Sequence, residues 1–241
     1  MTTPTNSHHL TLIKIFKSHQ NIQDNNAWVQ HYLGTNKTFY CLKTGDKLKL
    51  IKNYLKSTSL TYQDFTDLLV SLSHGSSFEE LSAMATVLSF YPEYRRKLPT
   101  SIVNRLFDHV CGWAETDVTC TFPADDLLAD WKNWQKLLSD FSIDSNIHKR
   151  RASLVILTLP LRQSDDSRLA EIALINVEKL KSEKDILITK AVSWVLRAMI
   201  KFHQSTVSDY LAKNKDSLPK IAVREVNSKL LTGKKYVKKR Q

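Results

Sequence analysis

The stretches TYQDFTDLLVSLSH (61–74) and SFEELSAMATVLSFY (77–91) follow each other almost directly, and each has the marks of a helix start. Each opens on a hydroxyl residue with an acidic residue three positions later, the spacing of a capping box. The two pairs are Thr61 with Asp64 and Ser77 with Glu80. Apolar residues then recur at helical intervals. Two capped helices separated by a Gly-Ser turn predict an antiparallel helix pair.

The helical pattern continues outward from this pair over nearly the whole chain. In TGDKLKLIKNYLK (44–56), Leu48, Ile51 and Leu55 form one apolar stripe. Only 5 Gly and 6 Pro are present, which favours long helices over many short strands. No segment has the alternating pattern of a strand ladder. Further helices are predicted over 100–117, 125–141, 144–159, 165–182, 185–203, 205–214 and 217–231.

The spacing of these segments predicts a repeat architecture. Helix pairs start near residues 61, 100, 144 and 185, and intervals near 40 approach the period of roughly 40–47 residues in HEAT-type repeats. The fold class is therefore predicted to be all-α: a HEAT-like helical-repeat solenoid, a curved right-handed superhelix of antiparallel helix pairs. We expect a single domain over 1–232, followed by a basic C-terminal tail over 233–241.

Positive charge is concentrated in the last part of the chain. Residues 1–145 carry 14 Lys and Arg against 15 Asp and Glu, whereas residues 146–241 carry 21 against 9. The whole formal excess of +11 therefore belongs to the second segment. Such asymmetry suggests a polyanion partner, most simply nucleic acid. A solvated basic surface with a basic tail is the alternative explanation.

Several classes of protein are disfavoured by the sequence. The longest apolar run, 152–161, is interrupted by Pro160 and is shorter than the roughly 20 residues of a membrane helix. The N-terminal leader is polar and unlike a signal peptide, so we expect a cytoplasmic protein, associated with the nucleoid if it is bacterial. Three cysteines without a CxxC pair favour neither disulfides nor zinc. His8 and His9 belong to the polar leader, and no metal or other cofactor is expected.

The stretch GWAETD (112–117) raises the first question of function. Trp113 and Asp117 are four residues apart, so a helix places both on one face. An indole favours a core and a carboxylate favours water, so this face is either a half-buried edge or a site. Asp117 has simpler explanations as a helix cap or as one half of an ion pair.

Two later stretches combine basic and aromatic residues. IHKRRASLVI (147–156) carries Lys149, Arg150 and Arg151 before an apolar run, an arrangement that is most often a solvated helix face. In KAVSWVLRAMIK (190–201), the central tryptophan lies among apolar residues and is most simply part of the core. The prominent residues of this second stretch are Lys190, Trp194, Arg197 and Lys201.

Taken together, these stretches resemble the AlkD-like DNA alkylation-repair family, bacterial glycosylases built from HEAT-like repeats. KAVSWVLRAMIK is similar to the family's penultimate-repeat signature, and AVREVNSKL (222–230) to its closing Arg-Glu helix. SNIHKRRASLVI (145–156) and GWAETD are similar to further family motifs, and 32–56 resembles its N-terminal segment with a Tyr-Leu-Gly turn. The resemblance runs in order from about residue 25 to residue 232.

The resemblance implies a monofunctional DNA glycosylase that excises cationic N3- or N7-alkylated purines from duplex DNA without base flipping. It assigns catalytic roles to Trp113, Asp117 and Trp194, and a phosphate contact to Arg151. Non-specific contacts to DNA would come from Arg150, Lys149, Lys190, Arg197 and Lys201, with Arg197 alternatively a structural ion-pair residue. The partner is then alkylated double-stranded DNA, bound by a monomer without a metal ion or a membrane.

This chain departs from the family pattern at two places. His148 stands where the family commonly has Trp, and Lys43 stands where it has Gly in an N-terminal motif that here lacks its Pro. These departures motivate a second hypothesis, a non-catalytic HEAT-like DNA-binding protein that retains the scaffold. A third hypothesis is a protein-interaction solenoid whose basic face binds an acidic partner.

Overall fold

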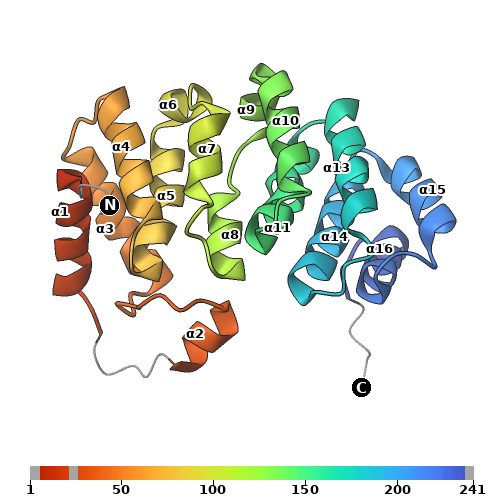
Figure 1. Cartoon of the computed structure of the whole chain (residues 1–241), viewed down its shortest axis with the longest axis horizontal. Helices are drawn as coiled ribbons and strands as arrows, with labels where there is room; N and C mark the ends of the chain where they lie inside the picture. The colour runs from red at the N-terminus through yellow and green to blue at the C-terminus, as the bar shows by residue number, and fades with distance from the viewer. Residues whose placement is uncertain (1–5, 22–26, 237–241) are drawn as a thin grey trace. The chain divides into compact units, whose positions relative to one another are not determined.

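A computed structural model describes residues 6–21 and 27–236 of the chain. Within these ranges the regular structure is helical (Figure 1). The chain divides into two compact units, Met1–Thr121 and Phe122–Gln241. Pairing of β type is limited, within the described ranges, to one isolated bridge between Thr38 and Ser77.

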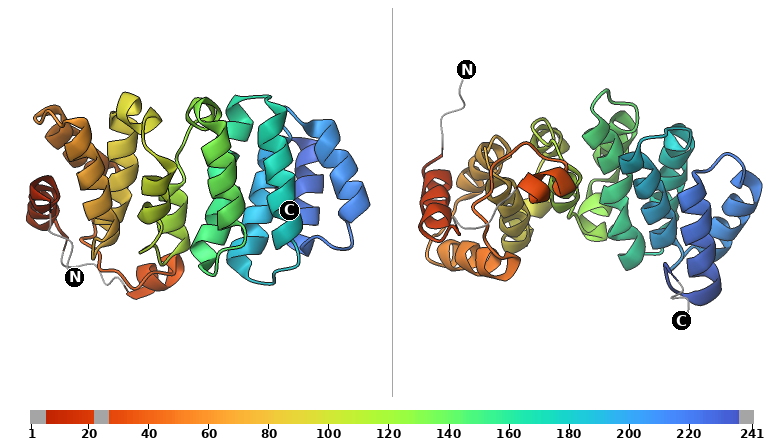
Figure 2. Two further views of the ribbon diagram at one scale, coloured as in Figure 1. Left: turned by 45° about the horizontal axis from the view of Figure 1, so that its top comes forward. Right: turned by 90° about the horizontal axis from the view of Figure 1, so that it is seen from below.

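Unit 1 contains two rows of helices. In the first row α3 packs on α5 and α5 on α8; in the second, α4 packs on α7 and also on α5 (Figure 2). Helix α1 packs against α3, α4 and α5. The helices are α1 (Ser7–Ser18), α2 (Ala27–Leu33), α3 (Thr44–Lys56), α4 (Tyr62–Ser73), α5 (Phe78–Phe90), α6 (Pro92–Arg96), α7 (Thr100–Leu106) and α8 (Trp113–Thr119).

Unit 2 repeats this arrangement with its own helices. One row runs from α11 through α14 to α16, and α10 and α13 pack on each other and on this row. The bounds are α9 (Ala124–Ala129), α10 (Trp131–Phe141), α11 (Ile147–Val155), a 3₁₀ turn (Ile156–Thr158), α12 (Pro160–Gln163), α13 (Ser167–Leu180), α14 (Ile186–Met199), α15 (Gln204–Asn214) and α16 (Lys220–Thr232).

The predicted fold class is confirmed: the protein is all-helical, with helices packed against their neighbours as in a helical-repeat solenoid. Both capping boxes form, with Asp64 and Glu80 each accepting a hydrogen bond from the backbone N–H of the cap residue. Each unit buries its own apolar core, which includes Phe65 and Leu88 in unit 1 and Phe141 and Leu196 in unit 2. None of the helices in the described ranges is long and apolar enough to cross a membrane.

Two predicted helices are interrupted. The segment predicted as one helix over 100–117 is α7 and α8, separated by Phe107–Gly112, because Gly112 is extended and closely packed rather than helical. The segment 125–141 is likewise α9 and α10. These two helices meet at Asp130, whose backbone is non-helical (φ −128°, ψ 48°). Polar and small residues inside a periodic pattern concealed both breaks.

The N-terminal segment was wrongly predicted to be a polar leader. Ser7–Ser18 forms α1, and His9 is buried in unit 1 (relative exposure 4%). Its imidazole contacts the Ser71 hydroxyl and the Glu80 carboxylate, each at 2.8 Å. His8 contacts the Tyr54 hydroxyl at 2.7 Å. Both histidines are therefore hydrogen-bonded parts of the fold, and residues 1–5 lie outside the described ranges.

The stripe predicted for 44–56 is correct at two positions and wrong at one. Ile51 and Leu55 are buried, but Leu48 is 39% exposed and Lys47 is buried in its place (9% exposed). Lys47, Ile51 and Leu55 follow the helical spacing i, i+4, i+8. The helix therefore turns a lysine, rather than a leucine, toward its neighbours.

The predicted basic tail begins with residues that contact α16. Gly233 ends that helix in the left-handed conformation (φ 71°). Beyond it, the Lys235 ammonium lies 3.4 Å from the Glu225 carboxylate and the Tyr236 hydroxyl donates to the same carboxylate at 3.1 Å. Residues 237–241 of the predicted tail lie outside the described ranges.

Candidate active site

The Trp113–Asp117 pair lies on one turn of α8, as its spacing predicts. Both side chains are half-buried, whereas Ala114, Glu115 and Thr116 between them are buried. The pair therefore forms the edge of the helix between core and solvent. An aromatic ring and a carboxylate thus share this edge.

The indole of Trp113 is fixed by the Tyr-Leu-Gly turn in which α2 ends. Its Nε1 donates to the main-chain carbonyl of Tyr32 at 2.6 Å. The Tyr32 ring lies edge-on to the indole, with centroids 5.5 Å apart and planes at 89°. Such edge-to-face packing is a favourable arrangement of aromatic quadrupoles. One hydrogen bond and one ring contact thus orient Trp113.

Two glycines permit this contact between the turn and α8. Gly34 has φ +68°, a conformation that side-chain-bearing residues rarely adopt. A Cβ at Gly112 would lie 2.6 Å from the carbonyl oxygen of Leu33, so only glycine fits there. The Tyr-Leu-Gly turn singled out in the sequence is therefore the support of the Trp113 indole.

A buried glutamate, missed in the sequence, ties the same segments together. Glu115 is fully buried and accepts hydrogen bonds from the Thr35 hydroxyl and from the backbone N–H of Cys111, the latter at 2.9 Å. It occupies the third position of α8, where a capping glutamate normally stands. Gly112 at the cap position hid this pattern, because the usual Ser or Thr is missing.

The basic run on α11 is largely engaged inside unit 2. Arg150 forms a two-point ion pair with Glu183 (2.8 and 3.2 Å) and donates to two main-chain carbonyls. Arg151 is 5% exposed, and its guanidinium donates to the carbonyl of Leu187 at 2.5 Å. Lys149 is 9% exposed and lies over the Phe141 ring. The segment therefore does not form the solvated basic face that is usual for such a run.

The second predicted cluster follows one side of α14. Lys190 is exposed, and Trp194, one turn later, is half-buried although Val195 and Leu196 beside it are fully buried. The simple core interpretation of Trp194 therefore does not account for its position. The Lys201 ammonium, just beyond the helix, donates to the carbonyl of Arg162 at 2.7 Å.

Arg197 belongs to an ion-pair cluster around Glu225. The carboxylate of Glu225 is 1% exposed and lies 3.4 Å from the Arg197 Nε. It also accepts a hydrogen bond from the Ser193 hydroxyl at 2.6 Å. Burial raises the pKa of Glu225, but hydrogen bonds from two hydroxyls and the nearby charges of Lys235 and Arg197 together hold it below its ordinary value. These contacts agree with the alternative interpretation of Arg197 as a structural ion-pair residue.

The structure thus places the predicted residues in two groups, one in each unit. Trp113 and Asp117 share a helix edge in unit 1, and the remaining residues lie on or beside α11 and α14 in unit 2. Unit 2 carries 23 Lys and Arg against 14 Asp and Glu, and unit 1 carries 12 against 10. Within the described residues there is no group of three or more potential metal ligands.

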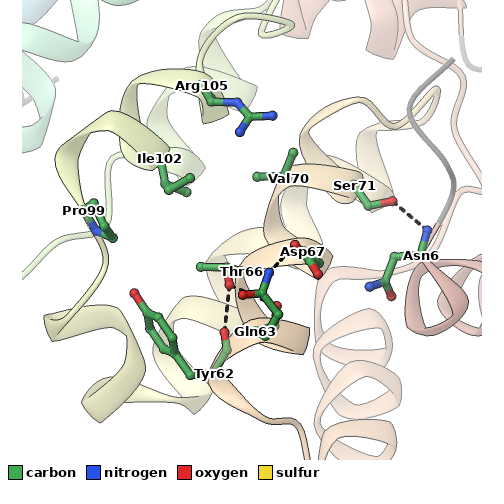
Figure 3. A pocket seen from close by; sticks show the side chains of 10 residues that line it. All are labelled: Asn6, Tyr62, Gln63, Thr66, Asp67, Val70, Ser71, Pro99, Ile102 and Arg105. Carbon is green, nitrogen blue, oxygen red and sulfur yellow. Dashed lines mark hydrogen bonds between the residues drawn. The ribbon is translucent and has the colours of Figure 1, made fainter. Parts of the chain in front are cut away.

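A groove elsewhere in unit 1 lies between α4 and α7 and has a volume of about 680 Å³ (Figure 3). Its polar groups are largely paired with one another. The Gln63 amide donates to Asp67 at 2.9 Å, and the Ser71 hydroxyl accepts from the backbone of Asn6 at 3.3 Å. We assign this groove no function.

These features define an all-helical protein built from helix pairs, with an aromatic–carboxylate edge in one unit and a strongly basic second unit. The sequence matches the family model described as DNA alkylation repair enzyme over residues 12–230, and the chain belongs to this family. No curated protein matches the sequence. Membership supports an enzyme role in DNA alkylation repair, with DNA as the partner.

Proposed function

We propose that this protein is a monofunctional DNA glycosylase that hydrolyses the N-glycosidic bond of cationic N3- or N7-alkylated purines in duplex DNA. The observation that carries the proposal is the half-buried Trp113–Asp117 edge of α8, whose indole is held by the end of α2. Family membership and the positive charge of unit 2 support it. The proposal treats residues 1–232 as one DNA-binding domain that acts as a monomer.

The chemistry proposed for Asp117 is electrostatic. A purine that carries a positive charge is already a good leaving group, so its departure needs no general acid. Positive charge then develops on the deoxyribose, and a carboxylate stabilises it and orients or deprotonates the attacking water. At about 4 Å and an effective dielectric near 20, the interaction is worth roughly 4 kcal/mol.

The proposed role of the tryptophans is to make that carboxylate effective. The Trp113 indole, fixed against Tyr32, excludes water beside Asp117 and attracts the electron-poor sugar through its ring quadrupole. Trp194, half-buried among fully buried neighbours, is proposed as the second aromatic. Chemistry at the sugar needs no pocket for the damaged base.

The phosphate contacts are proposed to come from unit 2. Lys190 is exposed, while Arg151, Lys149 and Lys201 are anchored by internal contacts that preset their positions. Such contacts supply affinity that falls with rising salt. Arg150 and Arg197 are held by Glu183 and Glu225, so the proposal rests on the other four residues.

The proposal predicts that Asp117→Asn retains duplex binding but loses excision. Loss of one charge interaction of this size lowers the rate by about a thousandfold. The measurement is release of free base from duplex DNA that contains N7-methylguanine, beside binding of the same duplex. Asp67→Asn, an exposed site on α4, is the matched control and keeps wild-type rates.

Persisting excision by Asp117→Asn removes the role assigned to this carboxylate. Absence of excision by the wild type, together with salt-dependent duplex binding, identifies the non-catalytic DNA-binding relative instead. Absence of duplex binding favours an acidic protein partner.

A further inference from the structure

A second concave site lies in unit 1 beside the Trp113 support. A cavity of about 800 Å³ is enclosed by α2, α3, the start of α5 and the chain between Phe39 and Thr44. Its walls include three aromatic rings, a lysine and a glutamate, namely Trp28, Phe39, Phe78, Lys47 and Glu79. None of these residues has a role in the function proposed above.

Lys47 is the unusual member of this cavity. It is only 9% exposed, and its ammonium lies 4.8 Å from the centroid of the Phe78 ring. Among the residues that the structure describes, none forms a hydrogen bond or an ion pair with this ammonium. A buried cation without a hydrogen-bond acceptor is costly, and burial accordingly lowers the pKa of Lys47 while Glu79 opposes this. As far as the described residues go, the cavity thus contains a donor without an acceptor.

The nearby carboxylate of Glu79 is committed elsewhere. It accepts hydrogen bonds from the backbone N–H groups of Tyr40 at 3.1 Å and Leu42 at 3.4 Å. Both N–H groups converge on it because Cys41 between them adopts the left-handed conformation (φ 59°). Glu79 therefore shapes the wall of the cavity, and the ammonium of Lys47 is left for a ligand.

The walls favour a flat aromatic ligand. The Phe39 and Phe78 rings are stacked, with centroids 5.3 Å apart and planes at 25°. Trp28, at the rim, is 69% exposed. The ring centroid of Trp28 lies 6.5 Å from that of Tyr32, and the centroid of Tyr32 lies 5.5 Å from that of Trp113. A series of aromatic rings therefore connects the rim of the cavity to the candidate catalytic helix α8.

We propose that this cavity receives one unstacked nucleobase of the bound DNA, with the Lys47 ammonium donating to an acceptor on the edge of the base. A nucleobase combines a flat apolar face, which stacks on aromatic rings, with carbonyl and ring-nitrogen acceptors. The inference rests on the proposed function, because it requires bound DNA. The base need not be the damaged one, since Asp117 acts at the sugar.

The test compares Lys47→Met with the wild type on a set of alkylated duplexes. In each duplex one nucleotide near the lesion, in either strand, is replaced by a tetrahydrofuran residue that lacks the base. We expect replacement at one position to weaken binding to the wild type by about a hundredfold, the size of a charge-assisted hydrogen bond together with the stacking of the base. Lys47→Met binds the complete duplex about tenfold more weakly and is less sensitive than the wild type to that replacement, because only the stacking of the base remains to be lost.

Lys52→Met is the matched control, because it removes the same charge from an exposed position of the same helix. It retains the wild-type sensitivity to the missing base. The melting temperature of Lys47→Met is expected to equal or exceed that of the wild type, because a desolvated charge is removed, so that weaker binding is not due to unfolding. Trp28→Ala, at the rim, is expected to show the same loss of sensitivity.

The outcomes separate the two proposals. If the effects of Lys47→Met and of the missing base add at every position, no base occupies the cavity and this inference is overturned. The proposed function is then untouched, provided that the wild type still binds and excises. Failure of the wild type to bind any duplex overturns the proposed function itself.

Discussion

Each unit contains a buried glutamate that joins distant segments, and the two are satisfied in different ways. Glu80 in unit 1 is 2% exposed and is held by the imidazole of His9 at 2.8 Å and by the backbone N–H of Ser77 at 2.9 Å. Glu225 in unit 2 is 1% exposed and contacts the permanently charged Arg197 as well as a serine hydroxyl. In both, hydrogen bonds outweigh burial and hold the pKa of the carboxyl below its ordinary value.

The two buried carboxylates differ in whether their partner must carry a charge. An imidazole donates whether or not it is charged, so the Glu80 site tolerates a change in the protonation of its partner. An arginine cannot lose its proton, so removal of Glu225 leaves a cation without its counter-ion. Unit 2, which has the greater excess of positive charge, is therefore the unit that depends more on its carboxylate.

The largest effect is expected for Glu225→Gln. Breaking a buried ion pair costs about 3 kcal/mol of unfolding free energy, because Arg197 is left half-buried without its partner. Urea denaturation followed by circular dichroism measures this loss. Glu93→Gln, which removes a pair with Arg96 at an exposed site (73% exposed), is the control and costs less than about 1 kcal/mol. Similar losses in the two variants would show that burial does not set the cost.

A smaller loss, about 2 kcal/mol, is expected for His9→Ala, which removes two hydrogen bonds and leaves the Glu80 carboxylate with fewer donors. The same denaturation experiment measures it. His8→Ala, which removes one contact to Tyr54 at a half-buried position, is the control and costs less. If the two histidine variants are equally destabilised, the buried network around Glu80 has no special weight.

The smallest and most gradual effect is that of pH. A carboxyl whose pKa is lowered on folding stabilises the protein above its unfolded pKa, near 4.5 for glutamate, and loses this contribution as the pH falls through the lower folded value. We expect the unfolding free energy to decline below about pH 4.5. The decline should be shallower in Glu225→Gln. An identical slope in wild type and variant would exclude Glu225 as a contributor.

Much of the helical pattern was predictable because it is local. The capping boxes at Thr61 and Ser77 and the apolar spacing within each helix depend on residues a few positions apart. The break before α8 was not, because it depends on the fit of Gly112 against Leu33, far away in the sequence. The burial of Lys47 in place of Leu48 likewise depends on the aromatic rings of other segments.

The candidate site was likewise predictable only where it depends on local spacing. The shared face of Trp113 and Asp117 follows from helical spacing alone. Glu115 was missed because Gly112 replaces the usual Ser or Thr at the cap, and because its other partner, Thr35, is 80 residues away in the sequence. The ion pair of Arg150 with Glu183 was equally invisible, since 33 residues separate them. Sequence patterns therefore identify candidate residues, whereas the competing partners of those residues emerge only in the folded chain.

The acceptor that orients the Trp113 indole belongs to the main chain of Tyr32. Replacing the side chain at position 32 removes a ring and leaves the hydrogen bond in place, so an alanine scan underestimates this contact. Substitutions at Gly34 and Gly112 are expected to disturb the contact instead, because the backbone geometry at these glycines sets the position of the segment that carries the Tyr32 carbonyl. The orientation of the Trp113 indole thus depends on two residues that have no side chain.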